Sequence, residues 1–472
     1  MGMRLIPGIL LRCNGLTGID SASTEWNRQS GEQSPLYFLA GGAYNTAMKT
    51  VAFETVGCRL NQYETEQIAA QFAKYGFRRV EFDEPADLYI VNTCTVTGRA
   101  DASCRNIISR AARHEKNPPV VVIGCYVDAE PDKVAQLNGV DLVIKNSDKV
   151  KVLNILQEKF PHLFEEDRDI PQIEAITEFH LHNRAWIKIG DGCNQHCTYC
   201  VIPLVRGRLH NRAPEDITRE INTLSQNGYN EVVLTGIHIG QYTYGDIESP
   251  AKLVRFILEK SDIVRIRLSS IEPQEVTAEL IEAIIDGGRR VCRHLHIPLQ
   301  SGSDRILKIM RRPYNVQRYR EIVGQVKDRV PHVVIGADII VGFPGETGDD
   351  FQQSVVAADS GLLDYLHVFS YSDRPGTDAS RLSGKVNPDT IKNRNAVLRA
   401  ISGKHYAEAL KREVGEIAYV ISEHRAESDN HYWGITDNYL KVKLPADVGG
   451  GKAVLAIRME SASERYLAGR MI

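Results

Sequence analysis

The chain has 472 residues, of which 43% are hydrophobic and 25% are charged, and its formal net charge is −3. This length exceeds one ordinary hydrophobic core and predicts about two to four domains of roughly 100–200 residues. The near-neutral charge excludes a strongly basic chain, so any nucleic-acid partner must meet local basic patches. The sequence contains no stretch of about 18 apolar residues, the length that is needed to span a membrane. The nine cysteines are not spaced like a disulfide framework, which indicates a reducing, cytoplasmic compartment.

Residues 1–47 are rich in Gly, Ser and Asn and show no sustained periodicity. The apolar stretch at 5–11 is short for a signal peptide and has no clear cleavage site. The first convincing strand comes directly after Met48. We therefore expect Met48 to be the natural start, and 1–47 to be a disordered extension or an error in the assigned start. N-terminal sequencing of the native protein that found Met1 or Gly2 would contradict this.

Residues 48–165 predict a small α/β domain. Strands are expected at 51–56, 88–91, 120–123 and 140–144, with helices between them at 64–75, 100–114 and 131–137. This alternation indicates a parallel sheet. Residues 166–183, which overlap the acidic and irregular stretch at 161–178, are predicted to be a linker.

Residues 184–406 repeat the strand–helix alternation six times. Strands are expected at 186–189, 231–234, 264–268, 295–297, 334–341 and 367–369. The intervening helices are expected at 214–226, 251–260, 276–285, 305–310, 316–330 and 349–359. Six such units predict a partial (β/α)6 barrel, in which chemistry takes place at the carboxyl ends of the strands.

Residues 411–472 change in character to five short strands, expected at 417–421, 432–435, 440–443, 453–459 and 466–469. They predict a small antiparallel β-barrel, a type that often contacts nucleic acid.

Cys193, Cys197 and Cys200 directly follow the first predicted barrel strand. Three thiolates within eight residues can hold a four-iron cluster and leave its fourth iron without a protein ligand. An open metal position can bind the amine and carboxylate of a substrate. A zinc clip is the alternative, but zinc needs a fourth ligand, and His196 beside Cys197 is poorly placed to complete the tetrahedron.

Three further cysteines each come just after a predicted strand: Cys58, Cys94 and Cys125. Because parallel strands end at the same edge of their sheet, these thiols should meet at one crevice. The arrangement predicts a second cluster with an open iron. The alternative is chance burial, since free cysteine is among the most buried residue types. We treat the remaining cysteines as structural or incidental: Cys13, Cys104 and Cys292.

The C-x3-C-x2-C spacing after the first strand of such a barrel resembles the radical S-adenosylmethionine (SAM) superfamily. The resemblance implies a [4Fe-4S] cluster at this triplet. It further implies SAM-binding residues at the carboxyl ends of later strands, here Thr235, Gly236, Ser269, Glu272, Gln300, Ser301, Gly342 and Gly345.

Together, the three segments resemble the methylthiotransferases over residues 48–472. This resemblance implies two [4Fe-4S] clusters, two uses of SAM and a TRAM-like RNA-binding domain at 411–472. One SAM methylates a sulfur on the open iron of the auxiliary cluster at Cys58, Cys94 and Cys125. The other is cleaved to a 5′-deoxyadenosyl radical, which removes hydrogen from a carbon without usable acidity. An electron donor such as flavodoxin or ferredoxin is implied, and the sulfur source stays open.

Members act on isopentenyl-adenosine in tRNA, on threonylcarbamoyl-adenosine in tRNA, or on an aspartate of a ribosomal protein. Four stretches resemble the members that act on threonylcarbamoyl-adenosine: 57–61 with 64–66, 234–238, 367–372 and 436–439. The resemblance implies methylthiolation of C2 of N6-threonylcarbamoyladenosine at position 37, in the anticodon loop. Three alternatives stay open: another tRNA adenosine, a ribosomal aspartate, or a non-catalytic iron–sulfur RNA-binding protein. A porphyrinogen oxidase type of radical enzyme would leave the three scattered cysteines unexplained.

Four arginines near the predicted rim are candidates for binding substrate phosphates: Arg206, Arg208, Arg311 and Arg312. The alternative is that they pair with nearby acids, as most surface arginines do. The last domain is not strongly basic, so its expected electrostatic signal is weak. Because the threonylcarbamoyl group carries a carboxylate, one buried arginine near the rim is expected, and the sequence does not identify it.

Overall fold

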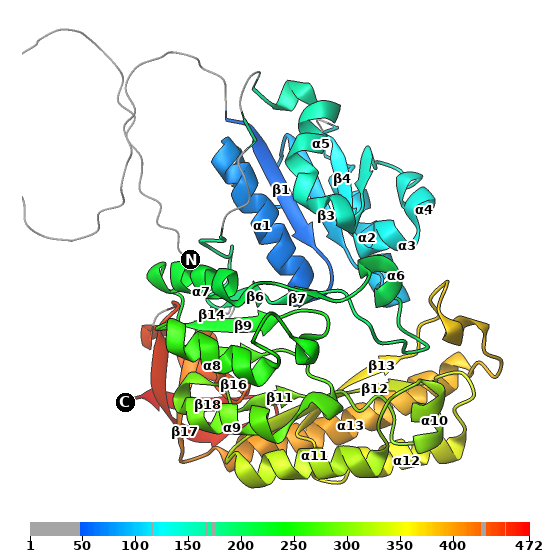
Figure 1. Ribbon diagram of the computed structural model, residues 1–472, viewed down its shortest axis with the longest axis vertical. Coiled ribbons are helices and arrows are strands. Elements are labelled where there is room, and N and C mark those ends of the chain that lie inside the picture. Colours follow the sequence, from blue (N-terminus) through cyan, green and yellow to red (C-terminus); the bar gives the residue numbers. More distant parts are fainter. Residues whose placement is uncertain (1–47, 115–116, 166–168, 171–174, 426–430, 449) are drawn as a thin grey trace, which may run out of the picture. The chain divides into compact units, whose positions relative to one another are not determined.

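Three sets of strands organise the chain in Figure 1, each drawn in its own range of colour. The computed structural model describes residues 48–114, 117–165, 169–170, 175–425, 431–448 and 450–472. The expectations for residues 1–47 lie outside this range. Of the helices in the described ranges, none is both long and apolar enough to cross a bilayer.

The first set is a parallel sheet in the order β2-β1-β3-β4-β5. Its strands are β1 (Thr50–Thr55), β2 (Arg78–Val80), β3 (Leu88–Thr93), β4 (Val120–Gly124) and β5 (Leu142–Ile144). Its helices are α1 (Arg59–Tyr75), α2 (Gly98–Ala111), α3 (Cys125–Ala129), α4 (Pro131–Ala135) and α5 (Val152–Lys159), with 3-10 turns η1 (Asn146–Lys151) and η2 (Pro161–Leu163). The expected strands and helices are present, whereas β2, α3 and α5 were not predicted because they are short.

Alternate residues of these strands pack against opposite layers of helices. Phe53 of β1 packs with Phe72 of α1 on one face of the sheet. Ala52, its neighbour, packs with Ile108 of α2 on the other face. A sheet that is covered on both faces explains the nearly continuous apolar strands. It also leaves the carboxyl edge as the place where polar and sulfur side chains collect.

The second set is a curved sheet of six parallel strands in the order β6-β9-β10-β11-β12-β13, in which bridges from Ile266 to Val291 and from Ser270 to His296 join two halves. The strands are β6 (Ala185–Lys188), β9 (Glu231–Thr235), β10 (Arg265–Leu268), β11 (His294–His296), β12 (Val334–Val341) and β13 (Tyr365–Ser370). The main helices are α7 (Pro214–Gln226), α8 (Pro250–Lys260), α9 (Ala278–Gly287), α10 (Asp304–Ile309), α11 (Val316–Arg329), α12 (Gly348–Ala358) and α13 (Pro388–Arg412). The predicted partial (β/α)6 barrel is confirmed.

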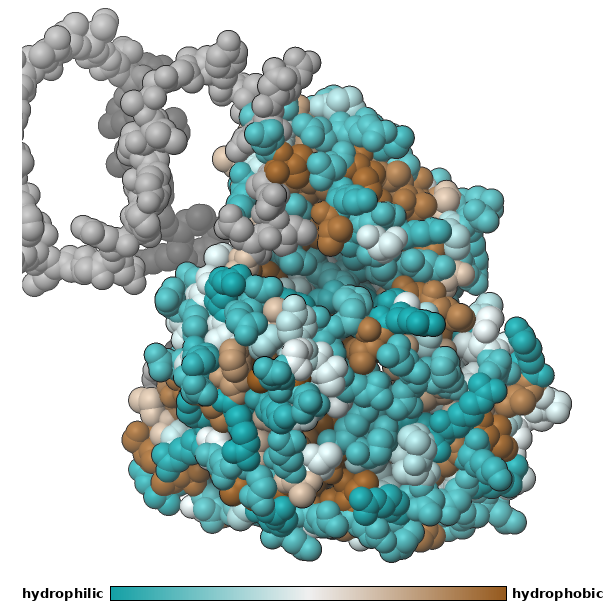
Figure 2. Space-filling view, in the orientation of Figure 1, coloured by the Kyte–Doolittle hydropathy of each residue, from teal (hydrophilic) through white to brown (hydrophobic). Residues whose placement is uncertain are grey.

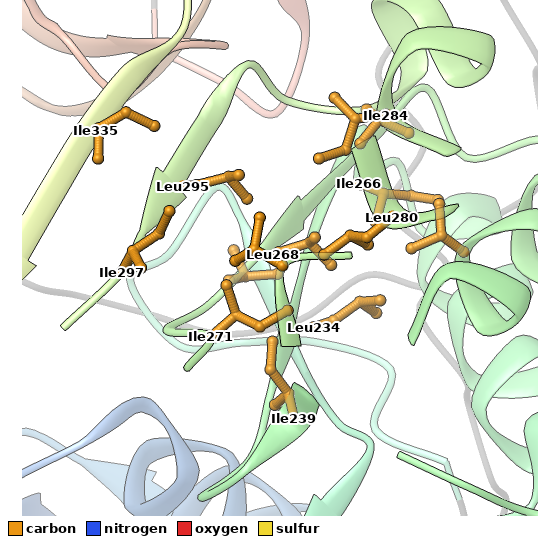
Figure 3. Close-up of a cluster of buried hydrophobic side chains, with 14 of the residues drawn as sticks. Leu234, Ile239, Ile266, Leu268, Ile271, Leu280, Ile284, Leu295, Ile297 and Ile335 are labelled. Atoms are coloured by element: carbon orange, nitrogen blue, oxygen red, sulfur yellow. The ribbon is translucent and has the colours of Figure 1, made fainter. Parts of the chain in front are cut away.

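The two faces of this curved sheet differ in chemistry. Ile266, Leu268 and Leu295 join Leu280 and Ile284 of α9 in the core shown in Figure 3. Side chains alternate along a strand, so the residues between them lie on the concave face. These are charged or polar and include Arg265, Arg267, His294 and His296.

The third set is a closed barrel in the order β14-β15-β16-β18-β17. Its strands are β14 (Ile417–Arg425), β15 (His431–Thr436), β16 (Lys441–Pro445), β17 (Val454–Ala462) and β18 (Leu467–Met471). The predicted barrel is confirmed, with one difference. β16 and β18 pair in parallel because β17 crosses between them, whereas the other pairs are antiparallel.

Candidate active site

The cysteine triplet lies in the loop that connects the antiparallel pair β7 (Gly190–Asp191) and β8 (His210–Asn211). The loop also contains the short helix α6 (Ile202–Arg206). The amide of Cys193 donates to the carbonyl of Gly207 at 3.1 Å, and the amide of Thr198 donates to that of Met310 at 3.2 Å. Gly192 has a φ of +73°, and a Cβ there would lie 2.1 Å from the carbonyl oxygen of Arg208. The backbone therefore fixes the loop before any metal is considered.

Cationic groups contact two sulfurs of the triplet. Arg312 donates to Sγ of Cys197 at 3.2 Å and pairs with Glu272. His238 Nδ1 lies 3.5 Å from Sγ of Cys193, and its Nε2 lies 2.6 Å from Glu275. Burial opposes a charge on His238, but the contacts with Cys193 and Glu275 outweigh burial and raise its pKa to about 9. These contacts suit sulfurs that carry negative charge.

The three scattered cysteines meet at the carboxyl edge of the first sheet. Cys58 follows β1, Cys94 follows β3 and Cys125 follows β4, and these three strands are neighbours. Their thiols are close enough to affect one another's ionisation. Loss of solvation is the main cause that raises the pKa of Cys94, to about 12, and the neighbouring Cys58 and Cys125 raise it further.

Gly57 allows this convergence. Its φ is +112°, and a Cβ at this position would lie 2.6 Å from Cβ of Cys94 and 2.9 Å from its sulfur. Asn61 of α1 ties the same loops together, because its amide donates to the carbonyls of Val56 (2.9 Å) and Thr93 (3.0 Å). The predicted crevice thus depends on one glycine and one buried asparagine.

Residues next to both cysteine sets line one cavity. It measures about 210 Å³ and is lined by Val96 and Thr97 from the first domain and by Cys200, Gln300 and Asp338 from the barrel. On a neighbouring surface, Cys125 packs against Val201 and Val205, which follow the triplet. The segments that carry the two cysteine sets are therefore neighbours in space, although they are far apart in sequence.

The donor chemistry fits iron–sulfur clusters at both sets. Within the described part of the chain, no three Cys, His, Asp or Glu side chains lie close enough to bind a single ion. A four-iron cluster does not require three side chains to reach the same ion, because each thiolate binds a separate iron. Cys104, the other cysteine nearby, is buried and its thiol contacts the carbonyl of Cys94 at 3.5 Å. Each set thus offers three thiols.

A buried ion cluster joins the two domains beside these thiols. Arg206, whose side chain is 1% exposed, pairs with Glu64 of α1 at 2.9 Å and with Asp191 of β7 at 3.0 Å. Lys149 and Lys188 also contact Glu64. Burial would raise the pKa of Glu64, but these cations outweigh it and hold the pKa well below its usual range. We call this group the Arg206 clamp.

A cavity of about 430 Å³ opens beside the Arg206 clamp and is lined by Asp128, Asn146, Leu204 and His210 as well as the clamp residues. Figure 2 shows hydrophilic side chains around a hollow between the elements labelled α1 and β7 in Figure 1. A second contact joins the domains next to Cys94: Arg374, after β13, pairs with Asp101 of α2 at 2.5 Å and lies 3.3 Å from the carbonyl oxygen of Thr95.

The predicted SAM-binding residues occupy two kinds of position. Thr235, Gly236, Ser269 and Glu272 lie just after or at the ends of β9 and β10, and Gln300 lines the cavity beside Cys200. The other three, Ser301, Gly342 and Gly345, make hydrogen bonds within the loops that follow the strands. Ser301 is buried and its hydroxyl accepts from the amide of Ser303; Gly342 and Gly345 have φ of +78° and +80° and donate to Glu346 and to the Gly384 carbonyl.

The four candidate arginines separate into two buried and two exposed residues. Arg206 and Arg312 are buried and paired with acids, which suits them to positioning rather than to binding phosphate. Arg311 is exposed and pairs with Asp378 at 2.6 Å. Arg208 is exposed.

The polar concave face of the barrel was not predicted from the sequence as part of the site. His294 Nε2 lies 2.8 Å from the hydroxyl of Tyr365, and His296 Nε2 lies 3.1 Å from Asp338. Gly336 lets the Tyr365 ring lie across the sheet, since a Cβ there would be 2.1 Å from the ring. The signal was the alternation of polar and apolar residues in β11 and β13.

The C-terminal barrel closes the amino end of this face. Arg267 donates to the carbonyls of Thr436 and Asp437, and its guanidinium lies 5.1 Å from the centre of the Tyr439 ring. The Tyr439 ring also stacks on His294, with 4.5 Å between ring centres. Residues 436–439, noted above only for their resemblance, thus form the floor of the chamber enclosed by the concave face.

Comparison with known proteins adds family information. Residues 50–145 match the model described as "Uncharacterized protein family UPF0004", and residues 187–357 match the "Radical SAM superfamily". A Bacillus subtilis protein named threonylcarbamoyladenosine tRNA methylthiotransferase MtaB is 36% identical over 444 residues, covering 90% of this chain and 97% of the relative. A protein of the same name from Aquifex aeolicus is 36% identical and covers 86% and 98%.

Other similarities are broader. A protein of Acidothermus cellulolyticus named tRNA-2-methylthio-N(6)-dimethylallyladenosine synthase is 32% identical, covering 97% of this chain and 93% of its own. Among solved structures, the radical SAM methyltransferase TsrM from Kitasatospora setae, with cobalamin and a [4Fe-4S] cluster bound, has a TM-score of 0.53. It is 15% identical and covers 71% of this chain and 77% of its own, so this likeness concerns the fold alone.

Proposed function

This chain belongs to the radical SAM methylthiotransferase family, and we propose that it adds a methylthio group to C2 of N6-threonylcarbamoyladenosine at position 37 of tRNA. The observation that carries the proposal is that the segments carrying the two three-cysteine sets are neighbours. Cys200 lines a cavity that is also lined by Val96 and Thr97, which follow Cys94, and Cys125 packs against Val201 and Val205. A reaction that removes hydrogen and then adds sulfur needs both agents within reach of one carbon. The names of the two 36% identical relatives support the choice of threonylcarbamoyladenosine.

We assign the residues as follows. Cys193, Cys197 and Cys200 hold one [4Fe-4S] cluster, and Cys58, Cys94 and Cys125 hold the other. When bound, the clusters and SAM supply the radical that removes hydrogen and the methylated sulfur that replaces it.

The protein's own part is to position these groups and to exclude water. Arg312 and His238 stabilise the negative sulfurs of the triplet. The Arg206 clamp and the Arg374–Asp101 pair hold the two domains at a fixed separation across the cavity. Tyr439 closes the floor, which limits the access of water that would quench a reactive species.

The proposal includes the reducing cytoplasm as the compartment, since the thiols must stay reduced to bind iron. It also includes a one-electron donor such as reduced flavodoxin or ferredoxin. The exposed Arg208 is a candidate contact for a tRNA phosphate.

The test uses reconstituted protein with SAM, reductant and an anticodon stem–loop that carries threonylcarbamoyladenosine. Mass spectrometry of the digested RNA should detect the 2-methylthio nucleoside, together with 5′-deoxyadenosine in the reaction mixture. Parallel reactions with an isopentenyl-adenosine stem–loop and with a ribosomal protein test the alternative substrates. Absence of 5′-deoxyadenosine under all conditions would favour the non-catalytic reading, whereas its formation with another acceptor would overturn only the substrate.

A further inference from the structure

Arg59 occupies an unusual position between the first domain and the C-terminal barrel. It is the first residue of α1 and directly follows Cys58. Its guanidinium donates to the hydroxyl of Tyr439 at 2.9 Å and lies 5.8 Å from the centre of the same ring. Arg59 is half-buried, and in the described ranges no carboxylate lies within ion-pair distance of it.

Among the described residues, the half-buried Arg105, Arg290 and Arg320 likewise have no carboxylate within ion-pair distance, whereas the buried arginines and Arg374 do have acid partners. They form the pairs Arg206–Glu64, Arg267–Glu231, Arg312–Glu272, Arg374–Asp101 and Arg394–Glu346. A guanidinium withdrawn from water normally needs such a partner, because the loss of hydration is costly. Arg59 therefore keeps its capacity to bind an anionic group brought by a ligand.

The surroundings of Arg59 place that capacity inside the reaction chamber. Its partner Tyr439 stacks on His294 of β11, and Nε2 of His294 lies 2.8 Å from the hydroxyl of Tyr365 of β13. Both His294 and Tyr365 lie on the concave face. Burial first, and then neighbouring cations that include Arg59, hold the pKa of His294 well below its usual range. Its imidazole is therefore neutral, and its buried Nδ1 has no hydrogen-bond partner among the described residues.

Polar side chains of the concave face extend from Tyr365 towards the cavity beside the triplet. The ring centres of Tyr365 and His367 are 5.2 Å apart. The rings of His367 and His296 have their centres 5.3 Å apart, and Nε2 of His296 lies 3.1 Å from a carboxylate oxygen of Asp338. Asp338 lines the cavity together with Gln300 and Cys200. His367 is exposed, so this part of the concave face is accessible from outside.

We propose that Arg59 binds the carboxylate of the threonylcarbamoyl group and thereby selects this substrate over adenosines with an uncharged N6 side chain. The inference rests on the proposed function, because it assumes that the modified adenosine enters the chamber. A guanidinium can hold a carboxylate through two parallel hydrogen bonds, and Tyr439 orients it for this from below. The same geometry favours the open form of threonylcarbamoyl, since cyclisation consumes the free carboxylate.

The competing explanation is that Arg59 only holds Tyr439 and so docks the C-terminal barrel. The two explanations differ in what they predict for Tyr439→Phe. This variant removes the hydrogen bond between Tyr439 and Arg59 but leaves the ring and the guanidinium. If Arg59 only docks the barrel, Tyr439→Phe and Arg59→Gln should have the same effect. If Arg59 binds the carboxylate, Tyr439→Phe, which keeps the guanidinium, should retain part of the preference for the charged substrate, whereas Arg59→Gln should lose it.

The experiment measures kcat/KM with two anticodon stem–loops of identical sequence, one carrying threonylcarbamoyladenosine and the other its methyl ester. We expect the wild type to prefer the carboxylate by roughly ten- to a hundredfold, the usual effect of hydrogen bonds to a charged group. In Arg59→Gln the ratio of kcat/KM for the carboxylate to kcat/KM for the ester should fall to about one. The fall should come from a lower kcat/KM on the carboxylate substrate, with little change in kcat/KM on the ester. Iron content and 5′-deoxyadenosine formation without RNA should equal those of the wild type.

Each other outcome has a defined meaning. A wild type that does not methylthiolate the carboxylate substrate overturns the proposed function. A wild type that does so, with an unchanged ratio in Arg59→Gln or equal loss on both substrates, overturns this inference alone. If Arg59→Gln fails to load iron at the adjacent Cys58, Arg59→Lys takes its place. Lysine keeps the positive charge but cannot donate two parallel hydrogen bonds to a carboxylate, so the preference of this variant for the carboxylate over the ester should be intermediate. An unchanged preference again contradicts the inference.

Discussion

The two cysteine sets are assembled in different ways. Cys193, Cys197 and Cys200 lie within eight residues, and hydrogen bonds from their own loop hold them in place. Cys58, Cys94 and Cys125 come from three separate loops and meet only because β1, β3 and β4 are neighbours in one sheet. A local set depends on its backbone, whereas an assembled set depends on the integrity of a whole domain. The two sets should therefore respond differently to the same kind of change.

Removing one set at a time should give the largest difference. In the Cys193→Ala, Cys197→Ala, Cys200→Ala variant, both 5′-deoxyadenosine and methylthiolated product should disappear. In the Cys58→Ala, Cys94→Ala, Cys125→Ala variant, 5′-deoxyadenosine should still form while the product disappears. Iron should fall from about eight to about four per chain in each case. Cys104→Ala is the matched control, and product formation without Cys58, Cys94 and Cys125 would contradict the assignment of the auxiliary site.

Gly57→Ala should affect the assembled set alone. The new Cβ would lie 2.6 Å from Cβ of Cys94, and a positive φ of +112° strains any other residue. We expect loss of the auxiliary iron, retention of the triplet iron, and a decrease of about 1–3 kcal/mol in the free energy of unfolding. Gly415→Ala separates the two causes, because Gly415 has a φ of +93° but open space around its Cβ position. Equal iron loss in both variants would argue against the steric cause.

The Arg206 clamp should make the contact between the two sets depend on pH. The pKa of Glu64 and that of Asp191 are both lowered, since the cations Lys149, Lys188 and Arg206 outweigh the effect of burial. A depressed carboxylate pKa contributes stability that is complete above the unfolded value of about 4 and is lost as the pH falls through the folded value. The contribution of the Arg206 clamp to stability should thus be constant from about pH 7 to 5 and decrease below about pH 4.

Arg206→Gln tests the origin of this acid dependence. Because it leaves Glu64 and Asp191 buried without their main partner, we expect a loss of about 3–5 kcal/mol at neutral pH. The decrease on acidification should also be shallower than in the wild type. Thermal unfolding followed by circular dichroism measures both quantities. A parallel shift of the whole curve, with an unchanged slope, would assign the acid dependence to other carboxylates.

Arg312→Lys should give the smallest effect, confined to the local set. Lysine keeps the charge near Cys197 but cannot also serve Glu272 and the hydroxyl of Tyr314. We expect the rate of 5′-deoxyadenosine formation to fall about three- to tenfold and the auxiliary iron to stay bound. Arg311→Lys is the neighbouring control, since Arg311 is exposed and pairs with Asp378 away from the sulfurs. Similar rates in the two variants would remove Arg312 from the site.

The difference between a local and an assembled cysteine set also explains how much of the site the sequence could predict. The triplet was visible because its spacing is local, and the strand–helix alternation predicted both the sheet and the partial barrel. The convergence of Cys58, Cys94 and Cys125 could also be inferred, because parallel strands end at a common edge. The 25-residue helix α13 was not predicted, since its apolar residues Leu398, Ala409 and Leu410 are sparse among charged ones.

Contacts that depend on three-dimensional proximity were beyond sequence reasoning. Nothing local indicates that Arg206 binds Glu64, which lies 142 residues earlier, or that Arg312 reaches Cys197. For this reason both arginines were considered as phosphate contacts. The polar concave face was detectable in principle, because His294 and His296 alternate with apolar residues. Its partner Tyr439 comes from a different domain, and no periodicity could connect the two.

The bond between Arg59 and Tyr439 also has a consequence for how the protein is made. It joins residues 380 positions apart, so translation at about 5–20 residues per second separates their synthesis by about 20 to 80 s. During that interval the first sheet can fold and present Cys58, Cys94 and Cys125 without the floor that Tyr439 later provides. Delivery of iron to the auxiliary thiols can thus precede closure of the chamber, and a chain that stops before β15 keeps its cysteines in a chamber that never closes.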